Sequence, residues 1–232
     1  MIGCKIIRAT IARQLQTAAA HQAIPQTIRQ FRTTYPHIHI EVREGNAAQL
    51  SLALETAQLD AAFLRSPVSL ATHLRFHTLL HEDLLLVLPA DHVLLPKPSP
   101  SATDQITQRP RISLHDLCQE SFILVRRPGA PGMYANFLKV CERLGFTPHI
   151  AMEVERKLSN INLVAAGAGI SVVPESMACF HTQNVRYCAI EQRFPELSAP
   201  LTLAYDVRRN NPVLDKFLHE TLAHFEVAAE AR

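Results

Sequence analysis

Length, composition and charge set the first limits on what this chain can be. Its 232 residues suffice for one large domain or two small ones, and 47% hydrophobic with 19% charged residues excludes the composition of a disordered chain. The net charge of +2, with no basic run longer than a pair, disfavours a nucleic-acid-binding surface.

The first part of the chain alternates short strand patterns with longer helical ones. Ile38, Ile40 and Val42 alternate with polar residues, which predicts a half-buried strand, and the helix before them should end at Tyr35-Pro36. Asn46 is placed to cap the next helix. The elements predicted here are strand 11–16, helix 18–33, strand 38–42, helix 46–57 and strands 59–64, 74–80 and 84–88.

The second part repeats this alternation after a proline-rich loop over residues 96–110. Its predicted elements are strand 122–125, helix 132–144, strand 149–154, helix 158–166, strands 169–173, 185–190 and 200–205, and helix 212–228. Two similar series joined by two crossing strands predict an α/β fold of two Rossmann-like lobes with a ligand cleft between them. In such sheets a ligand lies beyond the carboxyl ends of the strands, where helix N-termini favour an anion.

The chain shows neither a signal peptide nor a membrane span. Its first residues have too short an apolar run for a signal peptide, and no later stretch approaches the roughly 18 apolar residues of a spanning helix. We therefore expect a cytoplasmic protein with no membrane partner.

Several phrases occur in the order seen in the effector-binding domain of LysR-type transcriptional regulators. Most specific is the stretch 163–174, Leu-Val-Ala-Ala-Gly-Ala-Gly-Ile-Ser-Val-Val-Pro, in which Gly167 and Gly169 supply the turn from a helix into a strand. The other phrases are Ile24-Pro25 with Phe31-Arg32 and Tyr35-Pro36, Glu41 to Glu44, Leu54 to Asp60 with Phe63-Leu64-Arg65, Leu88 to His92, and Gly145 to Pro148. The chain resembles this family from residue 10 to about 225.

The resemblance implies a periplasmic-binding-protein-like fold (type 2). Lobe one would comprise residues 1–81 plus 199–232 and lobe two residues 82–198, with hinges near His81 and Ala199-Pro200. The family's DNA-binding helix-turn-helix normally precedes the first strand, and only about nine residues precede Thr10. We therefore expect that element to be missing from this chain.

The resemblance also places the effector at helix starts and strand ends. We expect Arg65, at the end of a strand, to hold a carboxylate bidentately; an ordinary exposed arginine is the alternative. The expected effector-binding residues are Thr17, Ala18, Asn46, Ala47, Arg65, Pro131, Gly132, Met133 and Leu201.

Two alanines depart from the family's pattern. Aromatic-acid-responsive members carry hydroxyl residues where this chain has Ala18 and Ala47, so backbone N–H groups, Thr17 and Asn46 would have to supply the donors. A bulkier or more apolar effector, or one held by fewer polar groups, would suit this pair.

Other chemistry has weak support. The five cysteines are scattered, which favours buried thiols in a reducing compartment over a redox switch between Cys179 and Cys188. His37 and His39 would share a strand face, yet no acidic residue or cysteine joins them at a metal-binding spacing, so we expect no metal and no cofactor. No nucleophile, phosphate-loop or dinucleotide motif occurs, so we expect no enzymatic activity.

We therefore interpret the chain as the effector-sensing and dimerisation domain of a LysR-type transcriptional regulator. It would bind a small molecule, such as an organic acid, and form a homodimer or homotetramer. Apolar residues on helices 18–33 and 46–57 would either make that contact or belong to the core of the domain. It would reach DNA only through the missing helix-turn-helix. The alternatives are a solute-binding protein of a transport system, which shares the fold but needs export, and an enzyme on a related two-lobed scaffold.

Overall fold

The computed structural model describes residues 6–7, 9–11, 18–43, 45, 47–65, 72–96, 109–125 and 132–230. The chain forms two compact units, which we call unit 1 (Met1–Glu82 with Ala199–Arg232) and unit 2 (Asp83–Ser198). Unit 2 is therefore inserted into the chain of unit 1.

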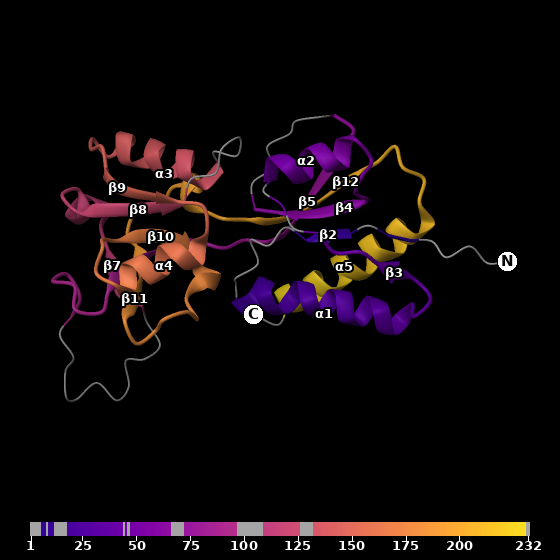
Figure 1. The fold of residues 1–232 in the computed structure, drawn as a ribbon, viewed down its shortest axis with the longest axis horizontal. Helices are drawn as coiled ribbons and strands as arrows, with labels where there is room; N and C mark the ends of the chain where they lie inside the picture. Colours follow the sequence, from indigo (N-terminus) through magenta and orange to yellow (C-terminus); the bar gives the residue numbers. More distant parts are fainter. Residues whose placement is uncertain are drawn as a thin grey trace. The chain divides into compact units, whose positions relative to one another are not determined.

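Unit 1 is built on a mixed sheet that combines strands from both ends of the chain (Figure 1). Its strand order is β2 (Ala9–Ile11), β4 (Ala61–Leu64), β12 (Leu201–Asp206) and β5 (Leu74–Leu80). β2 runs parallel to β4, whereas β12 is antiparallel to both of its neighbours. A short parallel pair is formed by β1 (Ile6–Ile7), which precedes β2 in the chain, and β3 (His39–Ile40), which follows α1.

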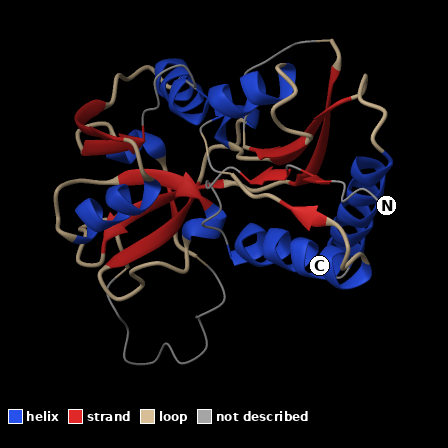
Figure 2. Cartoon of the chain, turned by 45° about the vertical axis from the view of Figure 1, so that its right-hand side comes forward, coloured by secondary structure: helices blue, strands red, loops and turns tan. Residues whose placement is uncertain are grey.

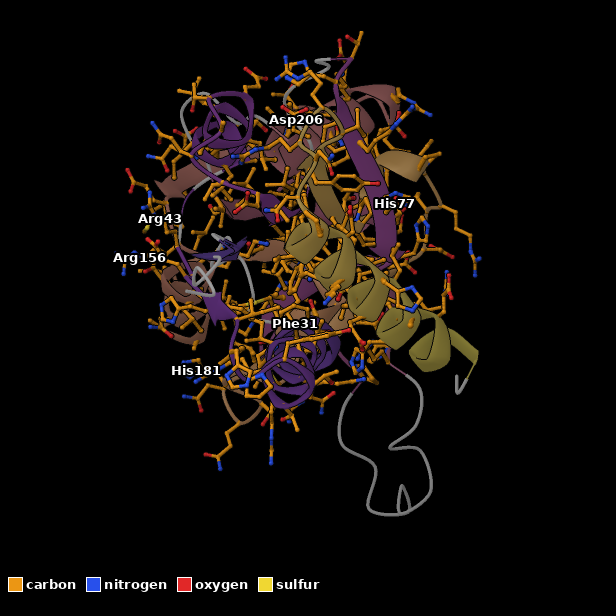
Figure 3. The ribbon with its side chains drawn as sticks, turned by 90° about the vertical axis from the view of Figure 1, so that its right-hand side faces the viewer. Phe31, Arg43, His77, Arg156, His181 and Asp206 are labelled. Carbon is orange, nitrogen blue, oxygen red and sulfur yellow. The ribbon has the colours of Figure 1, made fainter. Side chains whose placement is uncertain are left out.

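Alternating side chains of β4 pack on opposite faces of this sheet, as the period of a strand requires. Phe63 belongs to the core under α1 (Ala18–Thr34) and α5 (Pro212–Glu230), and Leu64 to the core under α2 (Ala47–Glu55). The ring of Phe31 meets that of Phe217 edge to face, with centroids 5.3 Å apart, which joins α1 to α5 (Figure 3). Helices thus cover both faces of the unit 1 sheet.

Unit 2 contains a four-stranded sheet and a parallel pair of strands (Figure 2). The sheet has the order β10 (Ser171–Pro174), β6 (Leu84–Pro89), β11 (Val185–Ile190) and β7 (Arg111–Ile112), and the pair is β8 (Ser121–Val125) with β9 (His149–Val154). Helices α3 (Gly132–Arg143) and α4 (Lys157–Ala165) follow β8 and β9 respectively. Ile161 and Val164 of α4 pack on Leu85 and Val87 of β6.

Gly167 and Gly169 make the turn from α4 into β10 for different reasons. Gly167 has φ +76°, in the left-handed region that glycine favours. Gly169 has φ +148°, and a Cβ atom there would lie 2.4 Å from the carbonyl oxygen of Ser121. This close approach allows Ile170 N–H to donate to Ser121 O at 2.9 Å, which links the β10 segment to β8.

The structure confirms most of the predicted elements and corrects some of them. The alternating pattern over residues 38–42 yields the two-residue strand β3, which pairs with Ile6 and Ile7 of β1, and Val42 is 51% exposed. β1 and β7 were not predicted. The expected first strand reaches β2 only at Ile11, and residues 12–16 lie outside the described residues, as do 97–108 of the proline-rich loop.

Candidate functional site

Several of the expected effector-binding residues of unit 1 lie at one edge of its sheet, where strands β2 and β4 end. β2 and β4 are parallel, so their carboxyl ends share an edge, and the antiparallel β12 begins at that same edge, with Thr202 opposite Leu64. Arg65 follows β4 there and Leu201 opens β12, while α1 is the next described helix after β2. Helix N-termini beyond strand ends present backbone N–H groups and a partial positive charge, which suits an anionic ligand.

The side chain of Arg65 is buried at this edge rather than extended into solvent. It is 3% exposed, and its Nη1 donates to the carbonyl oxygen of Ala199 at 2.6 Å. The same guanidinium binds both carboxylate oxygens of Glu82, with Nη1 2.9 Å from Oε2 and Nη2 3.2 Å from Oε1. Ala199 N–H in turn donates to Glu82 O at 2.7 Å. Arg65 therefore fastens together the two points where the chain leaves and re-enters unit 1.

Glu82 is a residue that the sequence analysis missed. It is itself 5% exposed, and no short motif links it to Arg65, which lies 17 positions earlier. The sequence offered one signal, an acidic residue two positions after a strand that ends in apolar residues, but such residues are common in loops.

The expected residues of unit 2 lie at the carboxyl ends of two parallel strands. α3 begins after β8 with Gly132, whose φ is +37°, and with the half-buried Met133; α4 begins after β9 with Lys157. Met133, Tyr134 and Lys157 line a small cavity of about 20 Å³.

Lys157 is the second residue that the sequence analysis missed. Its side chain is only 5% exposed, and it places a cation in the first turn of α4, where an acidic residue would normally complement the helix dipole. The dipole and the ammonium group therefore act in the same sense at this helix start, beside the hydroxyl of Tyr134, which donates to the carboxylate of Glu153 at 2.6 Å. The sequence carried one signal of this unusual helix start, because the first turn of α4 contains a lysine and no acidic residue.

The remaining expected residues are placed as follows. Ala18 opens α1, Ala47 opens α2 and is half-buried, and Leu201 is 1% exposed in the core beside Phe217. Thr17, Asn46 and Pro131 lie outside the described residues.

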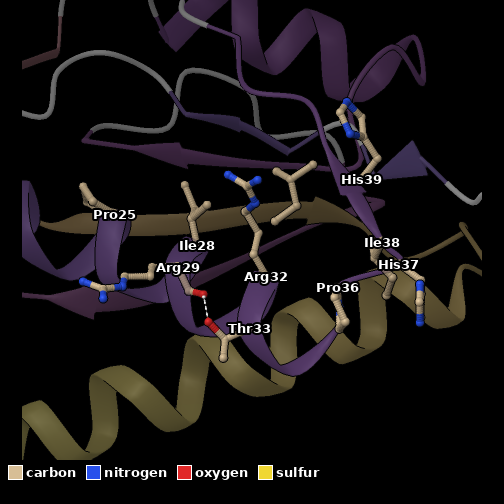
Figure 4. Close-up of a pocket in the computed structure, with 10 residues that line it drawn as sticks. Pro25, Ile28, Arg29, Arg32, Thr33, Pro36, His37, Ile38 and His39 are labelled. Carbon is tan, nitrogen blue, oxygen red and sulfur yellow. Dashed lines mark hydrogen bonds between the residues drawn. The ribbon is translucent and has the colours of Figure 1, made fainter.

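A separate surface groove of about 890 Å³ follows α1 and β3 in unit 1 (Figure 4). Its apolar lining comes from Ile28, Ile38 and Ile40, and Arg29 and Arg32 add positive charge. His37 and His39 also line it, but His37 lies in a turn and only His39 in β3, so the expected shared strand face does not form. Within the described residues no group of three or more His, Cys, Asp or Glu is placed to hold a metal ion.

The described cysteines are free thiols in contrasting environments. Cys141 and Cys188 are buried, and burial raises the pKa of Cys141 to about 12 and that of Cys188 to about 11. Cys179 is exposed and Cys118 half-buried, so the expectation of buried thiols was wrong for these two, while Cys4 lies outside the described residues.

Two compact α/β units whose helices begin at the carboxyl ends of strands are the architecture of a ligand-binding domain. A family model described as the LysR substrate binding domain matches residues 15–226. The chain belongs to this family and has its two-lobed, periplasmic-binding-protein-like fold.

Curated relatives of the chain are named as transcriptional regulators. The HTH-type transcriptional regulator AlsR of Bacillus subtilis (strain 168) is 29% identical over 202 residues, which cover 87% of this chain and 62% of AlsR. TtuA of Agrobacterium vitis, also an HTH-type regulator, is 33% identical over 157 residues, or 68% of this chain and 48% of TtuA. The chain thus spans about half to two thirds of the length of these relatives.

Solved structures share the fold. The BenM effector binding domain, solved with its effector benzoate, superposes with a TM-score of 0.78 at 22% identity, covering 98% of this chain and 95% of that one. The C-terminal domain of a probable LysR family regulator from Rhodococcus sp. RHA1 gives a TM-score of 0.74 at 20% identity, covering 94% and 99%. No helix among the described residues is both long and apolar enough to cross a membrane.

Proposed function

We propose that this LysR substrate-binding domain senses a small organic acid and regulates transcription as part of a longer protein with a DNA-binding domain. The observation that carries the proposal is the set of helix starts at strand ends in each unit, reinforced by the buried cation of Lys157. The relatives' regulator names and the benzoate that BenM binds support an acidic effector. The same comparisons favour a regulator over an exported solute-binding protein or an enzyme.

The proposed effector contacts are Thr17, Ala18, Asn46, Ala47, Arg65, Pro131, Gly132, Met133 and Leu201, to which we add Lys157. Ala18 and Ala47 leave the helix starts without a hydroxyl group, so backbone N–H groups and Lys157 would provide much of the polar recognition. Because Arg65 already binds Glu82, an acidic effector would share this guanidinium with the carboxylate or exchange with it.

A thermal-shift screen of benzoate, salicylate and short aliphatic acids tests the proposal. An acid that binds only the folded domain raises its Tm, and Ala47→Glu, which puts a negative charge at the start of α2, should abolish that rise. Leu52→Glu is the matched control, because it adds the same charge to the same helix at a side chain that is 60% exposed. Equal responses of both variants would remove the start of α2 from the site, and no response to any acid would contradict the acidic effector.

We propose further that the groove along α1 and β3 is a contact between copies of the chain. The groove combines an apolar floor with arginines on α1, where apolar dimer contacts were expected from the sequence, and none of the described residues that line it is acidic. In light-scattering measurements Arg32→Glu should shift the domain toward monomer, whereas Arg43→Glu, outside the groove on an exposed pair with Glu41, should not. An unchanged oligomeric state in Arg32→Glu would remove this groove from the interface.

A further inference from the structure

A second pocket, unrelated to the proposed effector contacts, lies wholly within unit 2. It has a volume of about 500 Å³ and opens at the end of the four-stranded sheet where β11 finishes and β6 starts. Its walls come from the start of β6, the segment around β7, and residues 192–197. None of the residues expected to bind the effector lines it.

Three arginines from two segments of the chain line this pocket, against two carboxylates. Arg109 forms an ion pair with Glu175 and is therefore largely neutralised. Among the described residues, Arg111 donates to main-chain carbonyl oxygens, those of Ile190 at 3.4 Å and Glu191 at 3.3 Å, which orient its guanidinium without cancelling its charge. With Asp83 as the other carboxylate of the lining, the pocket retains a surplus of positive charge.

Arg193 supplies the most available cation of this group. Its side chain is exposed, lines the pocket, and makes no hydrogen bond or ion pair within the described part of the chain. Arginine matches phosphate and carboxylate oxygens with two parallel N–H donors, so Arg111 and Arg193 are suited to hold one multiply charged group together.

The pocket is held in shape before any ligand arrives. The side chain of Gln192 accepts from Leu114 N–H at 2.9 Å and donates to Ser113 Oγ at 2.6 Å. The ring of Phe194 lies under the guanidinium of Arg143, whose carbon is 4.5 Å from the ring centroid. A preformed wall lowers the entropy lost on binding.

We propose that this pocket binds a small polyanion, a phosphate ester or a di- or tricarboxylate, at a site distinct from the effector site. The anionic group would lie against Arg111 and Arg193, and Phe194 and Leu197 would contact the apolar part of the molecule. The domain would then respond to two ligands of different charge. The second site does not depend on the acidic effector proposed above.

Isothermal titration of the whole chain with pyrophosphate and with citrate tests this site. At low salt we expect binding with a Kd near or below about 1 mM, and Arg193→Gln and Arg111→Gln should each weaken it about tenfold. Arg186→Gln is the matched control, because Arg186 lies on β11 outside the pocket and donates to the carbonyl oxygens of Thr182 and Val185. Binding of pyrophosphate alone would identify a phosphate site, and binding of citrate alone a carboxylate site.

Several results would overturn the second site. If neither probe binds, the pocket is not a polyanion site. Equal weakening by Arg193→Gln and Arg186→Gln would show that the arginines act only as general surface charge. Arg193→Gln should leave the thermal response to a monocarboxylic acid unchanged, so loss of that response together with polyanion binding would place both ligands in one site. A failed screen of monocarboxylic acids, in contrast, would count against the effector proposal alone.

Discussion

At the scale of single residues, we expect the greatest loss in the free energy of unfolding when one partner of the buried pair Arg65 and Glu82 is removed. Each charge is almost fully removed from water, and each is compensated chiefly by the other and by backbone groups at Ala199. Burying two charges costs several kcal/mol, which the mutual attraction and hydrogen bonds repay only while both partners are present. The pair therefore contributes more to geometry than to net stability.

Removing one partner of this pair should be costly. Glu82→Gln leaves the guanidinium of Arg65 buried without its counter-charge, and we expect the free energy of unfolding to fall by about 3–5 kcal/mol. Urea denaturation followed by circular dichroism measures this loss. Glu41→Gln, which breaks the exposed pair with Arg43, should cost no more than about 1 kcal/mol. Similar losses in the two variants would mean that burial does not govern the Arg65 pair.

Cysteine reactivity should follow burial. Since burial raises the pKa of Cys188 to about 11 and of Cys141 to about 12, both stay protonated at pH 8 and should resist iodoacetamide in the folded domain. Cys179 is exposed and should be alkylated first, as peptide mass spectrometry can show. Raising the pH from 8 to 9 leaves Cys188 and Cys141 mostly neutral, so their protection should persist. Rapid labelling of Cys188 in the native domain would contradict this assignment.

The sequence predicted the position of Arg65 better than its role. Its place at the carboxyl end of a strand followed from the apolar run before it, but its partners lie 17 and 134 positions away along the chain. Such contacts depend on strand pairing across the sheet, which no local pattern specifies. The burial of Lys157 could not be predicted for a similar reason, because it depends on neighbours that are distant in the sequence.

At the scale of elements, the turn from α4 into β10 depends on two glycines with different sensitivities. Gly169→Ala would place a methyl group 2.4 Å from Ser121 O and disturb the link to β8, so we expect a loss of about 2–4 kcal/mol. In Gly167→Ala the new Cβ atom would have no other atom within 4 Å, so the free energy of unfolding should fall only by the cost of a left-handed backbone, about 1 kcal/mol. Thermal or urea unfolding of both variants compares them. A smaller loss for Gly169→Ala than for Gly167→Ala would contradict the steric account.

Elements with strong periodicity and clear boundaries were predictable from the sequence. β9 and β11 have the predicted limits, and α3 begins at the predicted Gly132. The strand expected over residues 38–42 was too long because an alternating pattern gives no information about the partner strand, and among the described residues β3 pairs only at His39 and Ile40. β7 escaped prediction because two residues carry no period, and its strand character comes from pairing with β11.

At the scale of the whole molecule, unit 1 is discontinuous in sequence and unit 2 is not. β12, which reaches unit 1 only after residue 199, lies between β4 and β5 and pairs with both. Residues 83–198 produced alone should therefore unfold cooperatively, whereas residues 1–82 alone should not. Denaturation curves and amide hydrogen exchange of the two fragments check this. Cooperative unfolding of residues 1–82 would show that β12 is dispensable.

The insertion of unit 2 also fixes an order in time while the chain is being synthesised. Unit 2 is complete as soon as residue 198 has left the ribosome, whereas β4 and β5 must wait for the strand that joins them. During that interval the apolar side chains of Ala62, Phe63 and Leu64 lack their final cover, and the edges of β4 and β5 are unpaired. Residues 1–82 therefore complete their fold after unit 2 although they are synthesised before it, and their unpaired strands are most exposed to aggregation until β12 is available.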